Sequence, residues 1–277
     1  MTGRGGRGRQ VTRPGSPGTS RPYARIMPAP VTLPRIAWGD PGAERHALLI
    51  HGLGSNGPLM WLFGTALAEA GWYAVAVDLR GHGLAPRSTD YTLAAYGTDV
   101  AHVRREGGWD LVIGHSLGGA SATLAQATHP RWARHLVLVD PAIHLTPEQR
   151  AAVQAGNAAS FAAPTVEGVR AANPTWHPND VEAKVTSLRQ ASTWGTDQTA
   201  VQNPDWDVRE AFLALTVPTL VLAADPAVNS LFTGPAIDEL VAANPHVSVR
   251  VIEGAGHSLH RDKPAETLAA LFDGLAS

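Results

Sequence analysis

The sequence contains no cysteine and has no acidic residue before Asp40. The absence of cysteine excludes disulfides, thiolate metal sites and a cysteine nucleophile. No apolar run approaches the roughly 18 residues that a membrane-crossing helix needs. The 277 residues are 44% hydrophobic and 17% charged, which is typical of one globular domain carrying at most an insertion, and not of a disordered chain.

Charge is distributed unevenly along the chain. The first 35 residues contain seven arginines and no acidic residue, which leaves 15 basic against 24 acidic residues in the remainder. Such an acidic body argues against nucleic-acid binding, which requires a basic face. Residues 1–30 are rich in Gly, Pro, Ser and Arg and lack the apolar centre of a secretory signal, so we expect a disordered leader. Met27, where fold-like sequence begins, is the candidate native start.

Six short apolar runs predict buried strands, at residues 46–51, 73–78, 111–115, 135–140, 219–225 and 247–253. The runs are nearly continuous in apolar character, as expected for strands covered on both faces. Helical patterns lie between or after them, at 93–103, at 117–128 and from Pro264 onward. This alternation predicts an α/β fold with a mostly parallel, doubly wound sheet.

The alternation is interrupted once, over residues 141–216. Thr146-Pro147-Glu148-Gln149 has the pattern of a helix capping box, and helical stretches are expected at 165–172, 180–191 and 207–215. A segment of this length is too long for a plain connection. We therefore expect a helical lid inserted into a core made of residues 31–140 and 217–277.

The sharpest chemical signal is Gly114-His115-Ser116-Leu117-Gly118, a G-x-S-x-G motif between a predicted strand and a predicted helix. A serine in such a tight turn projects its hydroxyl above the sheet, and the glycines allow the close backbone approach that the turn needs. The Leu117 N–H then lies at a helix N-terminus, where it can stabilise a developing oxyanion. Ser116 is the candidate nucleophile.

A serine nucleophile needs a base, and the base needs a carboxylate to hold its tautomer. His257 follows the last predicted strand, so it is expected at the same sheet edge as Ser116. His260 is the alternative base. If it is not the base, we expect it to be a surface histidine. Asp225, at the end of the preceding strand, is the favoured acid, and Asp140, at the end of the strand before that, is the alternative.

The second oxyanion N–H is expected from the turn after the first predicted strand. Gly52-Leu53-Gly54 lies there, and the Leu53 N–H is the candidate, with Gly52 beside the substrate. Asp78 and Arg80 belong to a third loop at this edge. We expect them mainly to bond neighbouring loops, with substrate contact as the alternative.

Taken together, HGLGSN, DLRGHG, GHSLGG, LVDPA, Asp225 and GAGH resemble the motifs of the α/β-hydrolase superfamily, in its lidded, serine-nucleophile branch, from about Ile36 to the C-terminus. The resemblance implies Ser116 as nucleophile, His257 as base and Asp225 as acid, with Leu53 and Leu117 as oxyanion donors. Two departures stand out: the HGLG turn is unlike the HGGG of many lipases and esterases, and Ala223-Ala224 replaces the usual glycine before the acid.

The expected function is hydrolysis of a carboxylic ester or lactone, a small-molecule substrate, through an acyl-enzyme. Trp176, Trp194 and Trp206 of the lid are expected to form an aromatic wall for a bulky apolar or ring-containing substrate, or else simply to pack the lid. Carbon–carbon bond hydrolysis, amide cleavage, cofactor-free perhydrolysis and ligand binding by a vestigial triad are the alternatives. We expect no metal, no cofactor and no membrane or nucleic-acid partner. The expected location is the cytoplasm, and a homodimer is possible.

Overall fold

The structure is a computed structural model that describes residues 1–3 and 29–276. The predicted disordered leader, apart from its ends, and the candidate start at Met27 lie outside the described residues. The described strands form one seven-stranded sheet in the order β1-β3-β2-β4-β5-β6-β7. Strand β1 pairs antiparallel with β3, and every other pairing is parallel. The mostly parallel, doubly wound sheet predicted from the sequence is therefore confirmed.

All six predicted strands are present: β2 (Arg45–Ile50), β3 (Trp72–Val77), β4 (Leu111–His115), β5 (Leu136–Val139), β6 (Thr219–Ala224) and β7 (Val247–Ile252). The sequence reading missed β1 (Arg35–Trp38). This strand is only four residues long at the sheet edge, and its first three residues are exposed. It therefore lacks the apolar run that marks the others.

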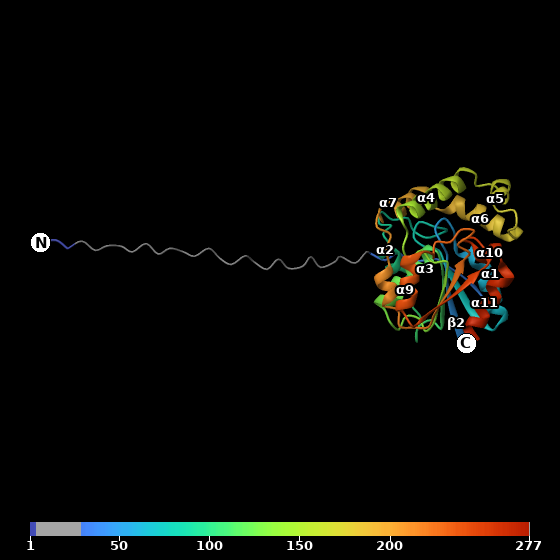
Figure 1. Ribbon diagram of the computed structural model, residues 1–277, viewed down its shortest axis with the longest axis horizontal. Coiled ribbons are helices and arrows are strands. Elements are labelled where there is room, and N and C mark those ends of the chain that lie inside the picture. Colours follow the sequence, from blue (N-terminus) through green and yellow to red (C-terminus); the bar gives the residue numbers. More distant parts are fainter. Residues whose placement is uncertain (4–28, 277) are drawn as a thin grey trace.

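Helices cover both faces of the sheet (Figure 1). One face packs against α2 (Leu93–Ala101), α3 (Leu117–Thr128), α8 (Arg209–Leu213) and α9 (Pro235–Ala243). The other packs against α1 (Trp61–Glu69), which follows the short 3-10 helix η1 (Gly57–Met60), and α11 (Pro264–Ala276).

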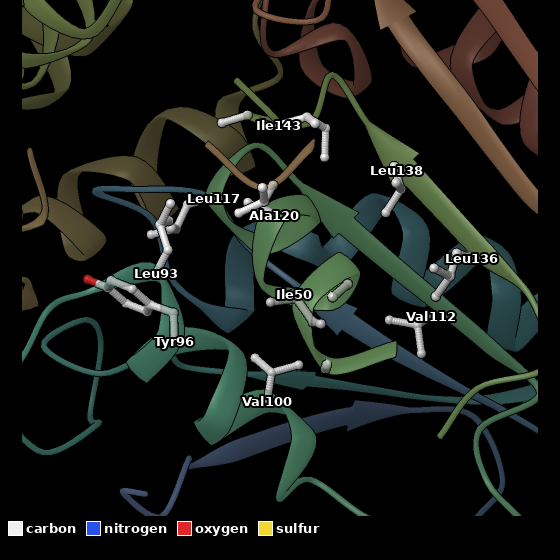
Figure 2. Packing of buried hydrophobic residues seen from close by; sticks show 14 of the residues in the cluster. Ile50, Leu93, Tyr96, Val100, Val112, Leu117, Ala120, Leu136, Leu138 and Ile143 are labelled. Atoms are coloured by element: carbon white, nitrogen blue, oxygen red, sulfur yellow. The ribbon is translucent and has the colours of Figure 1, made fainter. Parts of the chain in front are cut away.

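Side chains of one strand alternate between the two faces. Leu48 and Ile50 of β2 belong to the core beneath α2 and α3, and Leu49 belongs to the core beneath α1. Figure 2 shows Ile50 of β2 near Val100 of α2, and Val112 of β4 beside Leu136 of β5 in the same core. Complete burial of each such aliphatic side chain contributes about 1.5–3 kcal/mol, so both cores fix the strand ends that carry the site.

The region between β5 and β6 contains α4 (Pro147–Ala162), α5 (Val166–Ala172), α6 (Pro178–Gln190), α7 (Thr193–Val201) and α8, and we call residues 141–216 the helical insertion. The predicted capping box begins α4: Thr146 Oγ1 accepts from Gln149 N–H at 3.2 Å, and Gln149 Oε1 accepts from Thr146 N–H at 3.0 Å. Helices α4 to α7 lie together beyond one end of the sheet (Figure 1). The insertion also has its own small apolar cluster, formed by Val169, Val181, Val185 and Leu188. Among the described residues, every helix is too short or too polar to span a membrane.

Candidate active site

Ser116 occupies a sharp turn between β4 and α3. Its backbone has φ 54° and ψ −117°, a conformation that few non-glycine residues adopt. A Cβ on Gly118 would lie 2.3 Å from the carbonyl oxygen of Ile50, and one on Gly114 would lie 2.6 Å from that of Gly118. The G-x-S-x-G spacing is therefore a steric requirement, and the strained turn predicted from the motif is present.

Gly118→Ala is expected to lower the free energy of unfolding by about 3 kcal/mol, because the new methyl group would collide with rigid backbone at the end of β2. Urea unfolding measures this change. Gly156→Ala is the matched control: Gly156 lies within α4 with open space around it, so alanine there is expected to stabilise the protein slightly. Equal stability of the Gly118→Ala and parent proteins would contradict the steric account.

His257 lies against Ser116, as the sequence predicts. It follows β7 in a loop that leads into α10 (Leu259–Asp262), and its Nε2 is 2.9 Å from Ser116 Oγ. Ser116 is 7% exposed, whereas the His257 side chain is 24% exposed. The imidazole is therefore placed to take the serine proton.

The carboxylate on His257 belongs to Asp140 and not to Asp225, which corrects the favoured assignment. Asp140 Oδ2 lies 2.6 Å from His257 Nδ1. Asp140 follows β5, which lies directly beside β4 in the sheet, and its backbone has φ 38°. This left-handed conformation at the end of the strand accompanies the approach of the carboxylate to His257.

The surroundings of Asp140 stabilise its charged form. The residue is completely buried, and burial by itself raises its pKa. Hydrogen bonds from His257, from Leu231 N–H at 2.9 Å and from Ser230 Oγ at 2.6 Å outweigh burial, so the pKa of Asp140 lies below its ordinary value. An ionised carboxylate at this position holds the Nδ1–H tautomer of His257 and leaves Nε2 free to accept a proton.

Asp225 instead joins the ends of β6 and β7. Its carboxylate accepts from Gly254 N–H at 2.8 Å and from Ala227 N–H at 2.9 Å. These two backbone bonds hold the pKa of Asp225 below its ordinary value. The side chain is partly exposed and makes no contact with His257, so its role is to fix the turn that precedes the histidine loop.

The glycine-rich turn after β2 reaches Ser116 as expected. A Cβ on Gly52 would lie 3.1 Å from Ser116 Cβ and 2.9 Å from His115 Nδ1, so only glycine fits. In the part of the chain that the structure describes, neither Leu53 N–H nor Leu117 N–H donates a hydrogen bond to the protein. Both remain candidates for binding an oxyanion.

Two buried histidines hold this turn in place. His51 Nδ1 donates to the Gly52 carbonyl at 2.7 Å and Nε2 accepts from Leu79 N–H at 3.0 Å, while His82 Nε2 accepts from Gly54 N–H at 3.0 Å. Burial lowers the pKa of His82 to about 4 and that of His51 well below its ordinary value. Both imidazoles are therefore neutral near pH 7, as acceptor roles at Nε2 require.

The loop after β3, which contains Asp78 and Arg80, bonds neighbouring loops as the sequence predicts. Asp78 accepts from Gly57 N–H at 2.7 Å and from Leu84 N–H at 2.8 Å. The Arg80 guanidinium is completely buried and pairs with Asp99 at 2.6 and 2.8 Å. Both side chains thus bond neighbouring segments of the protein.

Sequence reasoning did not anticipate the buried imidazoles around Ser116 and His257. His115 Nε2 lies 2.9 Å from the carbonyl oxygen of His257, and the His115 ring lies 4.8 Å from those of both His257 and His260. His260 is 1% exposed and packs on Phe63, so the expectation of a surface histidine is wrong. Burial keeps the pKa of His115 and His260 well below the ordinary value.

The structure does not bring the three tryptophans of the insertion together. Trp206 is buried and donates to the Ala142 carbonyl at 2.7 Å, and Trp176 donates to Asp262 at 2.8 Å. Trp194 is 52% exposed and meets the Tyr91 ring edge-on. Trp176 therefore bonds the insertion to α10, and Trp206 packs into the core beneath α3 and α8, so no common aromatic wall is formed.

No cluster of three or more metal-ligating side chains occurs among residues 1–3 and 29–276.

Residues 47–271 match the family model described as "Alpha/beta hydrolase family". Among curated proteins, 2-(acetamidomethylene)succinate hydrolase of Mesorhizobium japonicum is 27% identical over 250 residues, covering 84% of this chain and 88% of that protein.

Solved structures that share the fold include those of two named enzymes. A crystal structure of E-2-(acetamidomethylene)succinate hydrolase matches with a TM-score of 0.75 and 24% identity, covering 89% of this chain and 96% of that chain. That of an N-formylmaleamic acid deformylase from Pseudomonas putida S16 matches with a TM-score of 0.72 and 22% identity, covering 87% and 96%.

Proposed function

The chain belongs to the α/β-hydrolase family, and we propose that it hydrolyses a carboxylic ester or lactone through an acyl-enzyme on Ser116, at the end of β4. The observation that carries the proposal is the continuous chain of contacts from Ser116 through His257 to the buried Asp140, at 2.9 and 2.6 Å. The helical insertion, in this proposal, acts as a lid that controls access.

The proposed reaction has two halves. His257 removes the proton of Ser116 as its Oγ attacks the substrate carbonyl, and the same histidine then protonates the departing alcohol. The N–H groups of Leu53 and Leu117 bind the oxyanion, each worth about 3 kcal/mol in comparable sites. Water activated by His257 afterwards releases the acid and restores Ser116.

An amide is the second candidate substrate, favoured by the named substrate of the Mesorhizobium relative, which contains an acetamido group. The same triad serves both bond types, since the histidine that activates Ser116 also protonates an amine leaving group. The two differ in the leaving group that His257 must protonate, which is an alcohol for an ester and an amine for an amide.

Parallel assays of p-nitrophenyl esters, lactones and N-acyl compounds test the proposal. Ester or lactone turnover is expected, together with irreversible labelling of Ser116 by a fluorophosphonate. Labelling without turnover of any of these substrates would contradict hydrolysis and favour a binding protein. Turnover of the N-acyl compounds alone would replace the ester proposal with amide cleavage.

A further inference from the structure

Arg261, at the third position of α10, is a buried cation with unused hydrogen-bonding capacity. It is 5% exposed, and its Nε and Nη2 have no hydrogen-bond acceptor. Nη1 donates a long hydrogen bond to Ser258 Oγ at 3.4 Å, and Nε forms a loose ion pair with Asp180 Oδ1 at 3.7 Å. A guanidinium carries five N–H donors, and leaving them unbonded in the interior is costly.

The neighbouring carboxylates are already engaged by other groups. Asp180, at the start of α6, accepts from Trp61 Nε1 at 2.8 Å, and burial raises its pKa. Asp262 accepts from Trp176 Nε1 at 2.8 Å and from Gly256 N–H at 3.0 Å. Neither carboxylate lies within hydrogen-bond distance of Arg261.

Lys184 supplies a second cation one helical turn beyond Asp180 on α6. Its Nζ donates to the Gly54 carbonyl at 2.8 Å, and in the part of the chain that the structure describes this is its one hydrogen bond. Gly54 directly follows Leu53, whose N–H is a candidate oxyanion donor. Lys184 therefore lies at the turn that faces the substrate, and the short helix α10 places Arg261 four residues after His257.

We propose that Lys184 and Arg261 form a subsite for a carboxylate carried by the substrate, between the helical insertion and the turn that follows β2. The inference rests on the proposed hydrolysis at Ser116 and adds the substrate class: acyl compounds with a negatively charged group at some distance from the reacting carbonyl. Arginine suits this role because its planar fork matches the two oxygens of a carboxylate.

The ionisation of Lys184 is consistent with a subsite that awaits an anion. Burial, and then the charge of Arg261, lowers the pKa of Lys184 to about 7. The other charged or titratable groups near it are Asp180 on its own helix and the buried His51 and His82 beside the turn. A bound carboxylate favours the ammonium form, so binding at pH 8 is expected to take up a proton.

Two pairs of esters with equal acyl lengths test the subsite. The mono-p-nitrophenyl esters of glutarate and adipate carry a carboxylate, and p-nitrophenyl valerate and hexanoate are their neutral counterparts. Lys184→Met and Arg261→Met are each expected to lower kcat/KM for the charged esters about 10- to 100-fold, mainly through KM, and to change it less than about threefold for the neutral esters. Arg189→Met, which removes an exposed cation from α6, the helix that carries Lys184, is the matched control. It is expected to leave kcat/KM unchanged for both the charged and the neutral esters.

Equal losses on charged and neutral esters in both variants would overturn the subsite, because they would show that the two cations only support the fold. The subsite would also be overturned if the parent protein hydrolysed neutral esters through Ser116 and showed no preference for the charged esters. That second outcome leaves the proposed function intact. Absence of any Ser116-dependent turnover would instead overturn the proposed function.

Binding to the inactive Ser116→Ala protein separates the subsite from catalysis. Calorimetry at pH 8 in buffers of different ionisation enthalpy is expected to show that glutarate binds with proton uptake. When Lys184→Met is added, glutarate is expected to bind at least tenfold more weakly and without proton uptake. No glutarate binding would overturn the subsite. Inorganic phosphate, used as a second probe, would overturn the assignment to a carboxylate if it bound more tightly than glutarate.

Discussion

Asp140→Asn is expected to lower kcat by about 10³- to 10⁴-fold, with little change in KM. The amide cannot carry the negative charge that stabilises a protonated His257, and its NH₂ group favours the wrong imidazole tautomer. Both consequences follow from the 2.6 Å contact between Asp140 Oδ2 and His257 Nδ1. Steady-state kinetics on a p-nitrophenyl ester measures the loss.

Asp225→Asn is the matched comparison, because the two residues end adjacent parallel strands. Asp225 accepts two backbone N–H groups and does not contact His257. An asparagine oxygen can keep one of these bonds, so the expected loss in kcat is no more than about fivefold, the equivalent of one hydrogen bond. The opposite order of effects would assign the acid to Asp225 and contradict the geometry described above.

Ser116→Ala is expected to lower kcat by about 10⁶-fold, the largest effect of any single replacement in this chain. The turnover that remains reflects oxyanion binding and substrate positioning, which do not need the hydroxyl. The circular dichroism and unfolding curves should stay close to those of the parent, because alanine removes a single atom from the site.

Ser121→Ala provides a control on the same helix. Ser121 is completely buried five residues further along α3, and its hydroxyl donates to the Leu117 carbonyl at 2.7 Å. Its replacement is expected to cost about 1 kcal/mol of stability and to leave kcat almost unchanged. Full turnover in Ser116→Ala would remove the proposed mechanism altogether.

The sheet could be predicted from the sequence because most of its strands are covered on both faces. Continuous apolar runs such as 111–115 permit few other structures, and the G-x-S-x-G motif placed Ser116 at the end of one of them. Edge strand β1 escaped detection because exposure of its first three residues removes that signal. The local hydrophobic pattern thus predicts strands that are buried and does not predict a strand that is largely exposed.

The choice between Asp140 and Asp225 could not be made in the same way. Both residues end adjacent strands at one sheet edge, so strand order alone allows either to reach His257. The structure favours Asp140 because Ser230 and Leu231, about 90 residues later in the chain, donate to its carboxylate. These contacts depend on how the loop after β6 folds back. The missing glycine at Ala223-Ala224 was the one sequence signal that pointed away from Asp225.

Buried cations such as Arg261 are invisible to sequence reasoning for a similar reason. Nothing in the residues around 261 distinguishes an exposed arginine from one covered by Trp176 and Asp180 of the helical insertion. The Arg261 Cζ lies 5.0 Å from the centre of the Trp176 ring, a contact between segments 85 residues apart in the chain. Only the packed structure reveals that its Nε and Nη2 lack a hydrogen-bond acceptor.

Mass spectrometry of the acid-quenched reaction with a slowly deacylated p-nitrophenyl ester tests the central claim most directly. The acyl group is expected on the tryptic peptide 106–131, with fragmentation placing it on Ser116 and not on Ser121. The same sample prepared from Ser116→Ala should carry none. Continuing turnover by the parent protein with the acyl group on a different residue would contradict the account.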